Sequence, residues 1–179
     1  MAKSRVLNNQ HQMGFSMLEL VVVIVIFLIL FGIANTKLTE MLETVERADF
    51  YRSLNRMQAQ LTLRVVDWYG SSDEVSRNWV ENVNPISLIE APPENYAGEY
   101  LSADLEHCPV SNWCYLSDQH QLVYRVKYQE DLKNSYEQKD LLFFSLRVTF
   151  SGDVVEKGVV TALTLKSVYD FQWQEKSFN

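Results

Sequence analysis

The 179-residue sequence lacks the motifs that most enzyme classes need. Its three histidines form no H-x-x-x-H pair, and it contains no G-x-S-x-G or G-x-x-x-x-G-K-[ST] segment. His107 and His120 are therefore expected at the surface or at a strand edge. We expect no catalytic residue, no cofactor and no motor activity in this chain.

Basic residues are also scarce. The chain has 16 Lys and Arg against 23 Asp and Glu, which gives a net charge of -7, and no run of five basic residues occurs. Nucleic-acid binding usually requires a basic patch or stripe. No nucleic-acid partner is therefore expected.

The chain has two cysteines, Cys108 and Cys114, in the segment HCPVSNWC. Their spacing allows a disulfide, which would indicate an oxidising compartment such as the periplasm. Two reduced, buried cysteines are the alternative. A zinc site is not expected, because no second ligand pair follows His107 and Cys108. Trp113 lies inside the possible disulfide loop and is a candidate for a ligand surface.

Charge is almost absent from one long apolar run, Phe15 to Ala34, where Glu19 is the only charged residue among twenty. Twenty helical residues span about 30 Å, the thickness of the bilayer hydrocarbon. Lys3 and Arg5 precede the run, which favours a cytoplasmic N-terminus and an external C-terminal part. A carboxylate in such a segment is treated as functional.

Cleavage by signal peptidase after Ala34 is an alternative, because Gly32 to Ala34 has a small-x-small form. The polar leader, the acidic residue and the continuing helical pattern count against it. If signal peptidase did cleave after Ala34, Asn35 would be the first mature residue.

Proline is absent between Phe15 and Val83, so nothing interrupts a helix there. Apolar residues recur at spacings of three and four, which predicts one helix from about Phe15 to Asp67, with Gly70 as a stop. The amphipathic half would present one apolar face: Leu38, Met41, Leu42, Val45, Phe50, Leu54, Met57, Leu61 and Val65.

The segment Gly14-Phe15-Ser16-Met17-Leu18-Glu19, after a polar leader with basic residues and before an apolar helix, resembles the type IV prepilin superfamily of pilins and type II secretion pseudopilins. The resemblance implies cleavage after Gly14 by a prepilin peptidase, which also N-methylates Phe15. Glu19 would lie near the Phe15 amine of a neighbouring subunit during assembly. Other pilin or pseudopilin subunits and an assembly platform are the implied partners.

Two features bear on the subtype. Major pilins commonly carry a proline at the position occupied here by Thr36, and its absence favours a minor or accessory subunit. The segment NPISLIEAPPENYAGEY, with NWCY and QLVYRVKY, resembles accessory pilin-like proteins of mannose-sensitive haemagglutinin pilus systems.

The C-terminal part alternates apolar and polar residues in three runs, QLVYRVKY, LLFFSLRVTF and VYDFQWQ, which indicates antiparallel strands. Ser151 to Asp153 and Glu156 to Gly158 are expected turns. We predict an α+β fold, in which a long N-terminal helix, transmembrane and then amphipathic, packs on an antiparallel sheet head. The face of Phe50, Leu54, Met57 and Leu61 would meet the sheet.

The expected organisation is a leader at 1–14, a transmembrane and assembly helix at 15–35, an amphipathic helix at 36–69 and a periplasmic head at 70–179. The expected function is a minor or accessory type IV pilus subunit in the bacterial inner membrane, crossing it once. The alternatives are a type II secretion pseudopilin, or a periplasmic domain tethered by its N-terminal helix.

Overall fold

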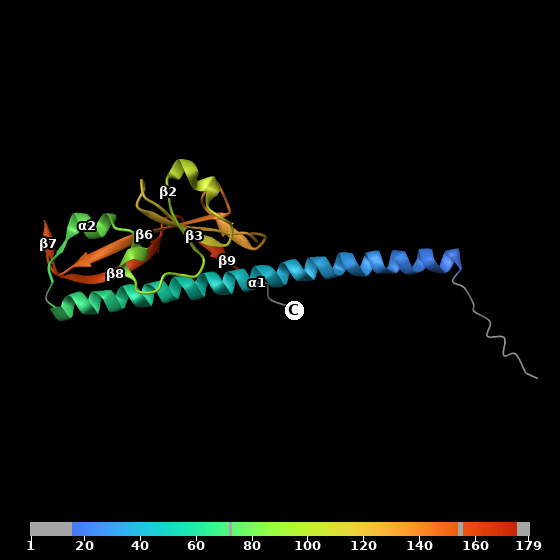
Figure 1. Ribbon diagram of the computed structural model, residues 1–179, viewed down its shortest axis with the longest axis horizontal. Helices are drawn as coiled ribbons and strands as arrows, with labels where there is room; N and C mark the ends of the chain where they lie inside the picture. Colours follow the sequence, from blue (N-terminus) through green and yellow to red (C-terminus); the bar gives the residue numbers. More distant parts are fainter. Residues whose placement is uncertain (1–15, 72, 154–155, 175–179) are drawn as a thin grey trace, which may run out of the picture. The chain divides into compact units, whose positions relative to one another are not determined.

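The computed structural model describes residues 16–71, 73–153 and 156–174 (Figure 1). The chain divides into two compact units, Met1–Glu40 and Met41–Asn179. Each unit is considered by itself below.

Helix α1 spans Met17–Ser71. At its start, the Ser16 hydroxyl accepts a hydrogen bond from the Glu19 backbone N–H at 3.2 Å, which is the bond expected of an N-cap residue. No proline interrupts the helix, and it continues through Ala34 and Asn35. It ends one residue after Gly70, slightly later than the pattern of apolar residues predicts.

Within the described residues, the head contains one short α-helix, two 3-10 helices and nine strands. In chain order, the elements after α1 are β1 (Val75–Ser76), α2 (Arg77–Asn82), the 3-10 helix η1 (Pro85–Leu88), β2 (Tyr96–Tyr100), the 3-10 helix η2 (Ser102–His107), β3 (Asn112–Leu116), β4 (Gln121–Arg125), β5 (Leu132–Asn134), β6 (Leu141–Phe150), β7 (Lys157–Gly158), β8 (Val160–Ser167) and β9 (Phe171–Trp173).

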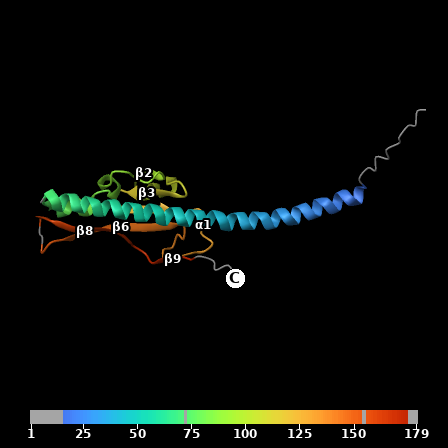
Figure 2. The ribbon, with the colours of Figure 1, turned by 90° about the horizontal axis from the view of Figure 1, so that it is seen from below.

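The main sheet has the strand order β2-β3-β4-β6-β8. Its neighbours pair antiparallel except at one edge, where β2 runs parallel to β3. In the view of Figure 2, the C-terminal part of α1 passes over this sheet, with β2 and β3 along one side and β6 and β8 along the other. The α+β fold class is therefore confirmed, with a sheet that is antiparallel apart from its β2 edge.

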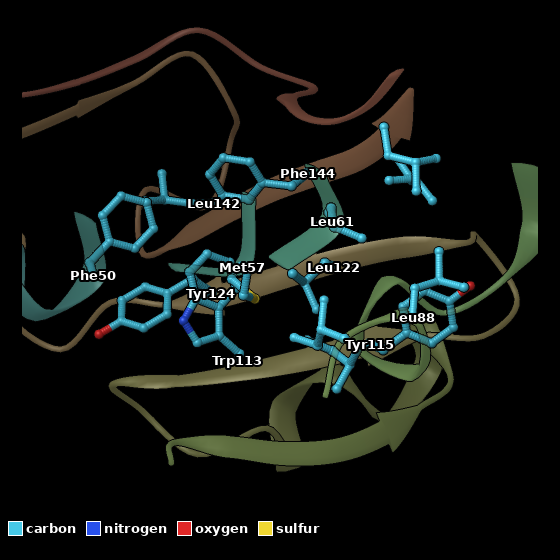
Figure 3. Packing of buried hydrophobic residues seen from close by; sticks show 14 of the residues in the cluster. Phe50, Met57, Leu61, Leu88, Trp113, Tyr115, Leu122, Tyr124, Leu142 and Phe144 are labelled. Atoms are coloured by element: carbon cyan, nitrogen blue, oxygen red, sulfur yellow. The ribbon is translucent and has the colours of Figure 1, made fainter. Parts of the chain in front are cut away.

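The core lies between α1 and the sheet. Phe50, Met57 and Leu61 are buried on the helix, and Leu54 packs against them, as the sequence predicted. Opposite them, Leu122 and Tyr124 of β4 and alternate residues of β6 point into the same cluster (Figure 3). The period-two pattern of β4 and β6 thus identified the buried face of the sheet.

Aromatic rings concentrate around Phe50. Its ring centroid lies 5.4 Å from that of Trp113 and 5.0 Å from that of Tyr124, and the Phe50 and Trp113 rings are nearly parallel (Figure 3). Trp113 is completely buried in this cluster. The suggestion that Trp113 contributes to a ligand surface was therefore wrong.

Two local expectations were wrong. Lys157–Gly158 of the expected turn forms strand β7, which pairs with β1 through Val75 and Ser76. Tyr169 was expected to share a buried face with Phe171 and Trp173, but it is exposed and contacts the ring of Tyr136 instead.

The expected apolar face of α1 divides into two. Its later residues, Phe50, Met57, Leu61 and Val65, are buried in the core. Its earlier residues, Leu38, Met41, Leu42 and Val45, are all exposed. The physical reason lies in the five-residue step from Val45 to Phe50, which turns a helix by about 140° beyond a full turn. The residues before this step therefore point in a different direction from those after it.

Candidate functional site

The apolar part of α1 has no covering within its own unit. Every described side chain from Met17 to Leu38 is exposed. Among the described residues, α1 is the one helix long and apolar enough to cross a bilayer. An apolar helix surface of this extent needs lipid or other apolar helices around it.

Glu19 lies in the first turn of α1 and is exposed. Its backbone N–H is bonded to Ser16, and its carboxylate stands near the positive end of the helix dipole, which favours a negative charge. The sequence S-M-L-E also has the spacing of a capping box. The Glu19 backbone thus takes part in the N-cap of α1, a local contact that the sequence analysis did not consider.

The expected cleavage and methylation positions, Gly14 and Phe15, lie outside the described residues. Their position relative to Glu19 is therefore not described. The placement of Glu19 at the start of the helix is the part of this site that the structure describes.

A second set of functional side chains was not predicted. Glu43 and Glu46 are buried at the helix–head interface, at 2% and 7% exposure. They form what we call the carboxylate clamp. Charged residues are rarely buried to this extent unless they are paired or hydrogen-bonded.

Glu46 accepts hydrogen bonds from three segments of the head. Its Oε1 accepts from the Ser111 hydroxyl at 2.7 Å and the Lys127 N–H at 2.9 Å, and its Oε2 accepts from the Tyr128 N–H at 2.8 Å. The Tyr124 hydroxyl donates a longer bond of 3.4 Å to Oε1. The loop before β3, strand β4 and the connection after β4 therefore converge on one carboxylate.

The environment of Tyr124 keeps its hydroxyl protonated. Burial raises the pKa of Tyr124, and the neighbouring Glu46 charge raises this pKa further. A protonated hydroxyl is the form that can donate to a carboxylate. Tyr124 therefore remains a donor to Glu46 throughout the physiological pH range.

Glu43 contacts a different part of the head. Its Oε1 accepts from the Asp131 N–H at 2.9 Å and from the Trp173 indole N–H at 3.1 Å. Its Oε2 is buried and has no hydrogen-bond partner among the described residues. The clamp thus ties α1 to both ends of the connection between β4 and β5 and to β9.

Cys108 and Cys114 form a disulfide that closes a loop, residues 108–114, which we call the disulfide loop. Its Ser111 contacts Glu46, and the Trp113 indole N–H donates to the Ser53 hydroxyl at 2.9 Å. The loop therefore contacts α1 at two positions along the helix, Glu46 and Ser53. The bond joins the two cysteines that the sequence suggested as partners.

Because Glu43 and Glu46 face inward, apolar residues of the same helical turns face outward. Met41, Leu42 and Val45 are exposed, and we call them the outward strip. Leu42 and Val45 line a groove of about 690 Å³ beside α1, together with Arg52, Arg56 and Tyr128. This surface is available for contacts with another molecule.

No metal-binding cluster is found within the described parts of the chain. His107 and His120 are both exposed, and the Tyr115 hydroxyl lies 3.4 Å from Nδ1 of His120. These side chains do not form a catalytic arrangement with a nucleophile.

Comparison with known proteins gives one match. A family model for the prokaryotic N-terminal methylation motif matches residues 9–35, which include Gly14, Phe15 and Glu19. No curated protein and no solved structure matches the chain. Within residues 9–35, the chain carries the N-terminal methylation motif of type IV prepilin-like proteins, which comprise pilins and pseudopilins and are structural rather than enzymatic.

Proposed function

We propose that the chain is a minor or accessory structural subunit of a type IV pilus, cleaved after Gly14 and N-methylated at Phe15. In this proposal it waits in the bacterial inner membrane with its head in the periplasm. Prepilin peptidase, other pilin-like subunits and an assembly platform are its partners. The observation that carries the proposal is the methylation motif at residues 9–35, which leads directly into an exposed apolar helix.

Glu19 supplies the assembly chemistry in this proposal. Cleavage after Gly14 would create an α-amino group at Phe15, with a reference pKa near 8, so that it is mostly protonated at neutral pH. The carboxylate of Glu19 would pair with this amine on a neighbouring subunit. Leaving one member of a buried ion pair alone typically costs about 3–5 kcal/mol, enough to reject a subunit in the wrong register.

The mature N-terminus is the first test. Mass spectrometry of the protein from bacterial membranes should find a methylated Phe15 at the start of the chain. A start at Asn35 would instead indicate signal-peptidase cleavage, and an intact Met1 would indicate a simple membrane tether.

The second test is Glu19→Ala, because the pilin and tether hypotheses disagree about it. Loss of a charge from an apolar helix makes membrane insertion easier, by at most about 2–3 kcal/mol, so a tether would be unharmed. A pilin-like subunit should still be cut after Gly14 but enter filaments poorly. Glu19→Gln, which keeps the shape and removes the charge, is the matched variant.

The readout is the ratio of subunit in sheared filaments to processed subunit in the membrane. A wild-type ratio for both variants would contradict the pairing role of Glu19. A type II secretion pseudopilin is the second candidate, because the same motif occurs there. Co-purification with pilus subunits rather than with secretion components separates these two candidates.

A further inference from the structure

The disulfide loop is held in an unusual backbone conformation by its contacts. Ser111 has a φ of 59°, in the left-handed region that a non-glycine residue seldom adopts. Its N–H donates to the Arg125 carbonyl, and its own carbonyl accepts from the Asn95 amide at 2.9 Å. Such a conformation persists only where the surroundings fix it. The Ser111 hydroxyl is thereby aimed at Glu46, 2.7 Å away.

The same loop carries both sulfur atoms out of reach of solvent. Cys108 and Cys114 are each 0% exposed. Thiol–disulfide exchange requires direct attack on a sulfur by a thiolate. The native disulfide can therefore be reduced only when the loop opens, and any contact that holds the loop shut must slow its reduction.

Glu46 is the residue best placed to hold the disulfide loop shut. Its Oε1 is shared between Ser111 in the loop and the Lys127 N–H in the connection after β4. Opening the loop removes the Ser111 donor from a buried carboxylate, which is costly because the charge then loses one of its hydrogen bonds. Glu43 offers a comparison within the same helix, because its hydrogen bonds within the described structure go to Asp131 and Trp173 and not to the disulfide loop.

We propose that closure of the Cys108–Cys114 bond and docking of the head on α1 are energetically coupled through the Ser111–Glu46 hydrogen bond. Coupling of this kind is reciprocal, so the disulfide strengthens docking and docking protects the disulfide. The joint between helix and head is therefore redox-sensitive. This inference goes beyond the proposed function and does not depend on whether the chain enters a filament.

The chemistry is ordinary thiol–disulfide exchange. On closure, the two cysteine thiols lose two electrons and two protons, and a disulfide-bearing oxidant accepts them and becomes two thiols. On reduction, a dithiol reverses this transfer. Because the sulfurs are buried after docking, oxidation is expected before the loop settles onto Glu46.

The test measures the rate at which dithiothreitol reduces the folded full-length chain in detergent micelles. The new thiols are trapped with iodoacetamide and counted by mass spectrometry. Glu46→Gln removes the charge to which the Ser111 hydroxyl donates, and Ser111→Ala removes the loop donor alone. Each should speed reduction by about tenfold, in keeping with the loss of one hydrogen bond to a charged group.

Glu43→Gln is the matched control, since it changes the other clamp residue in the same way. It should alter the reduction rate less than about twofold, because sites without a shared partner behave independently. The double variant Ser111→Ala/Glu46→Gln should be no faster than the quicker single variant, since both changes break the same bond.

Two results would overturn the proposal. One is a wild-type reduction rate in Ser111→Ala, which is expected to fold even if Glu46→Gln does not. The other is an equal acceleration by Glu43→Gln and Glu46→Gln, which would show that general loosening of the head, rather than the Ser111–Glu46 contact, exposes the sulfurs.

Discussion

Replacing Phe50 by alanine should remove the central side chain of the head's hydrophobic core. Phe50 is completely buried, and its ring lies within about 6 Å, centroid to centroid, of rings from β3, β4, β6 and β9. Truncation of a buried phenylalanine typically costs about 3–5 kcal/mol. Since so many aromatic contacts are lost together, we expect the upper part of this range. That is a large share of the roughly 5–15 kcal/mol that stabilises an ordinary domain.

The assay is equilibrium unfolding in urea of the full-length chain in detergent micelles. Trp113 and Trp173 lie beside Phe50, so tryptophan fluorescence reports unfolding of the head. Tyr51→Ala is the matched control, because Tyr51 is the next residue on the helix and is 38% exposed. It should cost about 1 kcal/mol or less. Equal losses for the two variants, or a loss below about 1 kcal/mol for Phe50→Ala, would refute the described core.

Three further predictions concern maturation, pH and surface contacts. Gly14→Val should block cleavage and accumulate the unprocessed chain in the membrane, because a β-branched side chain obstructs the peptidase; normal cleavage on an immunoblot would remove the prepilin assignment. Burial raises the pKa of Tyr115 to about 12 in the folded chain, so the unfolded chain loses the hydroxyl proton at a lower pH than the folded chain does. The free energy of unfolding should therefore fall as the pH rises from about 10 to about 12. Tyrosinate absorbance and urea unfolding measure this, and a constant stability across that range would contradict it. Val45→Asp should change the free energy of unfolding by less than about 0.5 kcal/mol but reduce the amount of subunit recovered in sheared filaments. Val66→Asp, at a similarly exposed position on the helix, should leave both quantities nearly unchanged.

Periodicity predicted the parts of the fold that are defined by a buried face. The spacing of Phe50, Met57 and Leu61 identified the inward side of α1, and alternation identified the inward side of β4 and β6. Both patterns arise because residues on one side of an element share the same core. The other side of the helix meets solvent, whereas Val123, Leu141 and Phe143 on the other face of β4 and β6 are buried in a second, smaller cluster. Strand β2 is as long as β4, but none of its residues is fully buried and its register shifts at Gly98, so it has no clear alternation. Strand β7 has only two residues, too few for such a pattern.

The carboxylate clamp could not be predicted in the same way. A glutamate on a helix is normally read as solvent-exposed, and the donors to Glu46 lie 65 to 82 residues away along the chain. Only the tertiary fold brings the Lys127 and Tyr128 N–H groups to that carboxylate. One local signal was present, however: the five-residue gap between Val45 and Phe50 breaks the apolar pattern at the turn where the clamp begins.

The clamp gives the head a fixed register on the inward face of α1, which is mainly apolar beyond the clamp. Glu43 and Glu46 lie at three- and four-residue spacing before Phe50, so they continue the same inward face. Leucine side chains at these positions would form no directional hydrogen bonds, so they would tolerate a slip of the head along the helix by one turn. With carboxylates, such a slip would remove the acceptor from three partly buried backbone N–H groups and from the buried Trp173 indole, at a cost of up to about 3 kcal/mol each. Single buried polar residues fix register in coiled coils for the same reason. The position of the outward strip on α1 is therefore set by the polar residues behind it.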